Sequence, residues 1–206
     1  MENVKFEIIT GGILSRYFGD HKNISIPNGV KVISDHLFEN SEKLKSVRLP
    51  YNLTTIGNYA FANCKDLEKI ELPNGVKTIG DFAFYHCESL KELIIPDSVE
   101  SIGKESFEDC KNLEKVTLPA GLKKISKKLF EDCENLKEIV LPNGIRKIDY
   151  DAFADCKKLE KIEIPASVKY ISEGAFDDCD NLVIYTPAGS IAEEYAKNNK
   201  IKFEIQ

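Results

Sequence analysis

The side chains with the greatest chemical potential in this sequence are six cysteines that recur at every twenty-third position: Cys64, Cys87, Cys110, Cys133, Cys156 and Cys179. Zinc-binding cysteines usually come in close pairs, and no CxxC occurs here, so the spacing argues against a metal site. A disulfide between neighbours such as Cys64 and Cys87 is geometrically conceivable. We favour a ladder of buried thiols that act as small apolar side chains, because each cysteine shares the inward face with a phenylalanine.

A second candidate for chemistry is His86, which precedes Cys87 and would suit a nucleophile and its base. Sequence neighbours usually point apart, and Asn63 and Asp109 stand at the equivalent positions one interval before and after. The other two histidines have no convergent partner, and the chain has no GxSxG, phosphate-binding or dinucleotide motif. We therefore expect no enzyme, no catalytic residues and no cofactor, and keep hydrolytic chemistry only as a formal alternative.

Acidic residues precede several of the cysteines: Glu108, Asp109, Glu131, Asp132, Asp155, Asp177 and Asp178. Stacked carboxylates could bind calcium, which would make the chain a calcium- or polysaccharide-binding structural repeat. The alternative is that these side chains accept hydrogen bonds from loop N–H groups in Asx-type turns. We favour the turns, and expect no metal, because no glycine-rich calcium repeat accompanies the carboxylates.

The elements that must position these residues are copies of a 23-residue unit, "LxxIxLPxGVxxIGxxAFxxCxx". Seven of the eight prolines, from Pro27 to Pro165, keep the interval, and the last, Pro187, falls one position short of it. Leu67, Ile70 and Leu72 predict a short strand that ends at proline. A turn and a second extended segment follow, and the spacing of Ala83, Phe84 and Cys87 predicts one helical turn. Such a unit buries a core only when its copies stack; we call each copy a rung.

Stacking explains why charges invert between copies while apolar residues stay. In an in-register parallel stack, equivalent residues lie about 5 Å apart, so like charges would repel. Three columns alternate in sign: Glu42, Lys65, Glu88, Lys111, Glu134, Lys157 and Asp180; Lys45, Glu68, Lys91, Glu114, Lys137 and Glu160; and Lys69, Glu92, Lys115, Glu138 and Lys161. Each charge then has opposite charges above and below it, and most of this face carries no single-sign field for a polyanion.

The Pro, Ile-Gly, Ala-Phe and Cys columns resemble the BspA-like leucine-rich repeat family, the 23-residue type of bacterial surface proteins, from Asn23 to about Tyr185. The resemblance implies an α/β solenoid: a curved, right-handed leucine-rich repeat array of about seven 23-residue rungs. Short parallel strands would line one face and short helical turns the other. It also implies an adhesion role at the cell surface, with host matrix proteins or other cells as partners.

Both ends of the chain predict capping elements for the open rungs. Residues 1–22 indicate a hairpin cap with its turn at Gly11 and Gly12. Residues 187–206 predict a short amphipathic helix capped by Ser190, and then a final strand. We therefore expect one domain, 1–206, with the repeats at 23–186, capped at both ends because exposed edges invite pairing.

Composition and charge limit the partners. The net charge of −6 and the pI of about 5.3 disfavour nucleic acid and anionic membranes. No apolar run reaches the about 20 residues of a membrane helix. The segment MENVKFEIIT lacks the apolar core of a signal peptide, so the location is cytoplasmic if this N-terminus is native, and cell surface or secreted if the resemblance decides. We expect a monomer that binds protein.

Two surfaces are candidates for that partner. On the concave strand face the outward column reads Ser25, Arg48, Glu71, Ile94, Thr117, Val140 and Glu163. Its central β-branched residues form an apolar spot typical of interfaces, although such residues also simply suit strands. A secondary aromatic patch comprises His36, Tyr59, Phe82 and Tyr85, and aromatic residues are enriched in binding hot spots. The first surface is our leading hypothesis for a protein-binding module, and an intracellular interaction scaffold is the runner-up.

Overall fold

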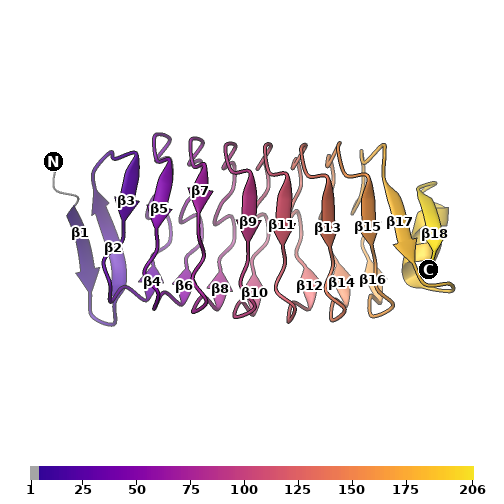
Figure 1. Ribbon diagram of the computed structural model, residues 1–206, viewed down its shortest axis with the longest axis horizontal. Helices are drawn as coiled ribbons and strands as arrows, with labels where there is room; N and C mark the ends of the chain where they lie inside the picture. Colours follow the sequence, from indigo (N-terminus) through magenta and orange to yellow (C-terminus); the bar gives the residue numbers. More distant parts are fainter. Residues whose placement is uncertain (1–4) are drawn as a thin grey trace.

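The computed structural model describes residues 5–206 and shows a solenoid whose turns stand side by side along one long axis, with the two termini at opposite ends (Figure 1). Two ladders of short parallel strands run along it. The first contains β3 (Asn23–Ser25), β5 (Ser46–Arg48), β7 (Lys69–Ile70), β9 (Glu92–Ile94), β11 (Lys115–Thr117), β13 (Glu138–Val140), β15 (Lys161–Glu163), β17 (Val183–Thr186) and β18 (Lys202–Ile205).

The second ladder comes from the extended segment after each proline turn: β4 (Val32–Ile33), β6 (Thr55–Ile56), β8 (Thr78–Ile79), β10 (Ser101–Ile102), β12 (Lys124–Ile125), β14 (Lys147–Ile148) and β16 (Tyr170–Ile171). Along the repeats, register partners in both ladders are equivalent positions of successive rungs, as in Val116 opposite Leu93 and Ile79 opposite Ile56. The expectation of strands on one face alone was therefore incomplete.

The predicted helical turns are wrong. The segment after each second-ladder strand is a series of turns with two residues at positive φ, for example Tyr59 at 54° and Asn63 at 59°. A residue in this left-handed region interrupts a right-handed helix. Asn and Asp tolerate the conformation better than most residues, which explains why they dominate the second of these two positions. The spacing of apolar residues is the same in a right-handed helical turn and in these left-handed turns, so it could not distinguish the two.

A stack of phenylalanine rings forms the centre of the core. Phe38, Phe61, Phe84, Phe107, Phe130, Phe153 and Phe176 lie one above the next, with ring centroids 5.1 to 5.7 Å apart. Six of these seven side chains are among the largest that are fully buried. The in-register stacking predicted from the 23-residue period is thereby confirmed.

The ends of the chain continue this stack. The hairpin of β1 (Lys5–Ile9) and β2 (Ile13–Phe18) pairs through β2 with β4, and the Tyr17 ring packs 5.2 Å from that of Phe38 at a tilt of 52°. At the other end Tyr195, on α1 (Ile191–Asn198), meets Phe176 edge-on at 5.9 Å. Ser190 caps α1 by accepting a hydrogen bond from the Glu193 amide at 3.1 Å, as predicted. The expectation for residues 1–4 lies outside the described part.

The sign-alternating columns form ion pairs between rungs in two of the three cases. In one column Lys45 lies 2.8 Å from Glu68, and in the other Lys157 lies 3.3 Å from Glu134. In the third column the alternating residues are in register, but Lys161 bonds Glu163 of its own strand at 2.8 Å. Exposed pairs of this kind are each worth little, so their main effect is to avoid the repulsion of like charges.

Each ladder is interrupted once. The first has no bridge between β7 and β9, and the second has none between β10 and β12, within residues 5–206. At the second interruption Leu129 stands buried where four other rungs carry alanine. The bond from the Phe107 amide to the Leu129 carbonyl is 3.2 Å long, against 2.8 Å for the equivalent bond from Phe61. The longer bond and the missing bridge thus coincide with the bulkier side chain, although Leu37, the other leucine of this column, leaves the bridge between β4 and β6 intact.

Candidate functional site

The outward residues of the first ladder form one surface, which we call the strand face: Ser25, Arg48, Glu71, Ile94, Thr117, Val140 and Glu163. All of them are exposed, because the three-residue strands bury their middle residue and turn both neighbours outward. The structure therefore places every predicted residue of the leading surface on one side of the solenoid. Their role in binding stays a prediction.

The middle of the strand face is apolar. Ile94 and Val140 are each 71% exposed, and Thr117 lies between them, in register with Ile94. Monomeric proteins seldom leave large aliphatic side chains this far out in a row on ordered strands. Covering the two aliphatic side chains with a partner would contribute about 1.5–3 kcal/mol each.

The N-terminal part of the strand face is a polar groove of about 970 Å³. Arg48 lines it, together with a 2.8 Å ion pair between Lys69 and Glu71. The hydrogen bond from Lys69 lowers the pKa of Glu71, so this carboxylate stays charged. Tyr51 lies at the rim of this groove and is 77% exposed, but it was not among the residues predicted from the sequence. The signal was present, since this turn position carries Asn, Asp or Ala in the other repeats.

Between the polar groove and the apolar middle of the strand face lies the interruption between β7 and β9. A groove of about 510 Å³ lies there and is lined by residues of both rungs, among them Glu68, Leu72, Lys91 and Ile94. Neighbouring rungs are tied by bonds such as that from the Glu114 amide to the Lys91 carbonyl, at 2.8 Å. Within residues 5–206, β7 and β9 make no such bridge, and strands without a neighbour are where a partner chain can pair.

The secondary aromatic patch is a continuous stack. His36 and Tyr59 lie 4.7 Å apart and Tyr59 and Phe82 4.5 Å apart, both nearly parallel, while Tyr85 meets Phe82 edge-on at 6.0 Å. His36 is exposed and the other three are half-buried. The patch is therefore less exposed than its position in the repeat predicted. All three stacked residues have φ between 54° and 60°. Its use as an interface stays a prediction.

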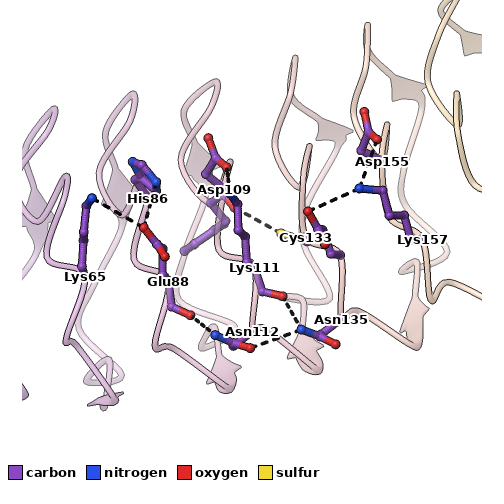
Figure 2. Close-up of polar contacts among 12 residues, drawn as sticks. Lys65, His86, Glu88, Asp109, Lys111, Asn112, Cys133, Asn135, Asp155 and Lys157 are labelled. Atoms are coloured by element: carbon purple, nitrogen blue, oxygen red, sulfur yellow. Dashed lines mark hydrogen bonds and ion pairs between the residues drawn. The ribbon is translucent and has the colours of Figure 1, made fainter.

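The cysteines are free and buried, as we favoured, and the disulfide alternative is wrong. Each Sγ donates a hydrogen bond to a phenylalanine carbonyl of the preceding rung, for example Cys133 to Phe107 at 3.2 Å (Figure 2). Burial raises the pKa of Cys64 and Cys110 to about 12. Thiols in this state are poor nucleophiles and poor metal ligands, so the ladder is structural.

The residues beside the cysteines make charge contacts rather than a catalytic pair. The His86 Nε2 lies 3.0 Å from a Glu88 carboxylate oxygen that also faces Lys65 (Figure 2). The buried Cys87 thiol instead donates to the Phe61 carbonyl at 3.2 Å. Asp109 and Asp155 face lysines instead of converging on one point (Figure 2). Among residues 5–206, no three His, Cys, Asp or Glu side chains are grouped closely enough to hold a metal ion.

The predicted Asx-type bonds occur, but at another column. The Asp35 side chain accepts from the Asn58 amide at 2.8 Å, and Asn58 accepts from the Asp81 amide at 2.8 Å, so these residues join successive rungs. The acidic residues before the cysteines instead include a partly buried pair that the sequence did not reveal. Burial and the adjacent Glu131 raise the pKa of Glu108 to about 8.

Comparison with known proteins gives consistent matches. A family model described as the BspA type leucine rich repeat region matches residues 15–133 and 54–183, with six copies. No curated protein sequence matches the chain. Among solved structures, a leucine-rich repeat protein of T. pallidum is similar over 98% of this chain and 95% of its own, at 27% identity and a TM-score of 0.81.

Two other solved structures share the fold. A leucine-rich repeat protein from Bacteroides ovatus matches with 22% identity and a TM-score of 0.65, over 90% of this chain and 70% of its own. The pneumococcal vaccine antigen PcpA matches with 25% identity and a TM-score of 0.53, over 90% of this chain but 42% of its own. Within residues 5–206, no helix has the length and apolarity needed to cross a membrane.

Proposed function

Because the chain belongs to the BspA-type leucine-rich repeat family, we propose that it is a non-enzymatic protein-binding module whose partner docks on the strand face. One observation carries the proposal: the open, ordered apolar strip of Ile94, Thr117 and Val140, continuous with two grooves on the same face. An apolar centre bordered by charged residues is the usual composition of a protein interface.

The supporting energetics are local. Ile94 and Val140 offer the apolar area, whereas Arg48 and Tyr51 belong to the residue types that most often dominate binding energy. Glu71 and Lys69 already neutralise one another, so they set orientation more than affinity. The surface is built from strands, so little conformational entropy is lost when a partner binds.

We place this module at a cell surface, with a matrix or cell-surface protein as partner, because the proteins of this repeat type are typically surface proteins. An intracellular scaffold is the competing location. Labelling of intact and lysed cells with an antibody against the chain separates them: labelling of lysed cells alone would reject the surface setting and leave the binding face untouched.

The binding face is tested with a triple variant, Arg48→Glu, Glu71→Lys and Ile94→Asp. Binding of purified matrix and cell-surface proteins is measured by biolayer interferometry, with a matched control of equal charge change away from the strand face: Lys31→Glu, Glu194→Lys and Ile191→Asp. We expect affinity to fall about 100-fold or more in the first variant only, since a buried contact residue commonly contributes about 2 kcal/mol or more. Equal binding by both variants, at unchanged melting temperature, would reject the strand face.

A further inference from the structure

The second ladder carries cations that do not alternate in sign. On β12 and β14, Lys124 and Lys147 are register partners, and the next partner along is Tyr170 on β16. These strands lie side by side in the C-terminal half of the solenoid (Figure 1). Like charges directly opposite one another in a sheet are destabilising, so this arrangement departs from the three alternating columns.

The adjacent column is also cationic. Lys123, Arg146 and Lys169 occupy successive rungs, joined by backbone bonds of 2.7 and 2.9 Å. Together with Lys124 and Lys127 of the first of these rungs, they make five exposed cations for which the described residues provide no ion-pair partner. The carboxylate that could have faced Lys123, that of Glu100, is paired with Lys77 at 2.9 Å.

Folding does not require these cations. In the N-terminal rungs the Lys124 column reads Val32, Thr55, Thr78 and Ser101, and the Lys123 column reads Lys31, Thr54, Lys77 and Glu100. The same ladder therefore forms with neutral or acidic residues at both positions. A cluster that raises repulsion without serving the fold indicates a ligand that supplies the missing negative charge.

Two exposed aromatic rings complete the surface. Tyr150 is 47% exposed and Tyr170 48% exposed, and the Lys147 ammonium lies 5.3 Å from the Tyr170 ring centroid. Tyr170 continues the register column of Lys124 and Lys147, and Lys147 is itself paired with Asp149 at 3.1 Å. Apolar ring faces next to an array of cations can hold the C–H faces of sugars while the cations bind their anionic groups.

We propose that this surface, Lys123, Lys124, Lys127, Arg146, Lys169, Tyr150 and Tyr170, binds a linear sulfated polysaccharide. These cations stand on three successive rungs, about 4.8 Å apart, which calls for a dense row of anions. An extended acidic peptide presents carboxylates to one face only about every 6.6 Å. Nucleic acid fits poorly, since the chain has a net charge of −6 and nucleic-acid-binding domains are generally strongly basic.

The test is isothermal titration calorimetry of the full chain with heparin at physiological ionic strength. The variant Lys123→Glu with Arg146→Glu should lose at least about tenfold in affinity, because two favourable ion contacts become repulsive. Its matched control, Lys22→Glu with Lys31→Glu, makes the same change in net charge on exposed lysines of the N-terminal rungs and should bind within about twofold of the parent. Melting temperatures establish that both variants fold.

Further arms identify the ligand class and the role of the rings. Tyr170→Ala should weaken heparin binding several-fold and Tyr170→Phe should not, whereas the strand-face triple variant should bind heparin normally. Desulfated heparin, poly-glutamate and duplex DNA should bind more weakly than heparin at equal charge concentration. The proposal is overturned if heparin does not bind, if the control pair loses as much as the patch pair, or if poly-glutamate or DNA binds as tightly.

Discussion

Replacing Phe107 with alanine is the sharpest test of the stacked core. Its side chain is fully buried, and its ring lies 5.5 Å from that of Phe84 and 5.7 Å from that of Phe130. A buried phenylalanine-to-alanine change typically costs about 3–5 kcal/mol, and stacked ring contacts account for about 0.5–1.5 kcal/mol each within such a loss. We therefore expect a decrease near the upper end, about 4–5 kcal/mol.

The matched control is Phe6→Ala. Phe6 is half-buried and contacts one ring, that of Tyr17 at 5.6 Å, so its loss should cost only about 1–2 kcal/mol. Unfolding in urea gives both values from the midpoint and the slope. Because each rung contacts only its neighbours, Phe107→Ala should also separate the unfolding of the two halves. This description of the core would be refuted if the two variants lost the same free energy of unfolding to within about 1 kcal/mol and each unfolded in one sharp transition.

Three other outcomes are expected. The pKa of Glu108 is raised from 4.5 to about 8, so the protonated form suits the fold and the melting temperature should fall as pH rises from about 4.5 to about 8; Glu108→Gln should flatten that decline, and an unchanged decline would contradict it. The six buried thiols should react with a thiol reagent only after unfolding, and all six should then react without reductant. The absorbance of the reagent at saturation gives the number of reacted thiols per chain. Leu129→Ala should lower the free energy of unfolding by less than the usual about 2–5 kcal/mol, because alanine fills this position on four other rungs and the two rungs can then approach each other. Hydrogen exchange at the Phe107 amide should slow. Unchanged exchange together with a full cost would show that Leu129 does not hold the rungs apart.

The parts of the fold that follow from the period of the repeat could be predicted from sequence. A fixed interval brings like residues together, so the Phe38-to-Phe176 stack and the buried cysteines needed no further information. The backbone of the turns could not be predicted, because Ala83 and Phe84 have the same spacing in a helical turn and in the left-handed turns that form. The interruption between β10 and β12 was also hidden, since leucine at position 129 is as apolar as the alanine of four other rungs.

The strand face was found because alternation within a strand separates inward from outward residues, and Arg48 and Ile94 obey it. The groove between β7 and β9 could not be predicted, because it depends on the absence of backbone hydrogen bonds between these two strands. The pair of Glu108 and Glu131 was missed for a related reason: the sequence gives their column but not the depth at which the turn holds them.

The alternating columns impose a parity on the length of this protein. Lys45, Glu68 and Lys91 repeat their sign every second copy, so removing two adjacent copies leaves every junction between opposite charges. Removing a single copy instead creates a seam where like charges meet in three columns at once. Growth or shrinkage of the array by unequal recombination should therefore be tolerated more readily in steps of two copies than in steps of one.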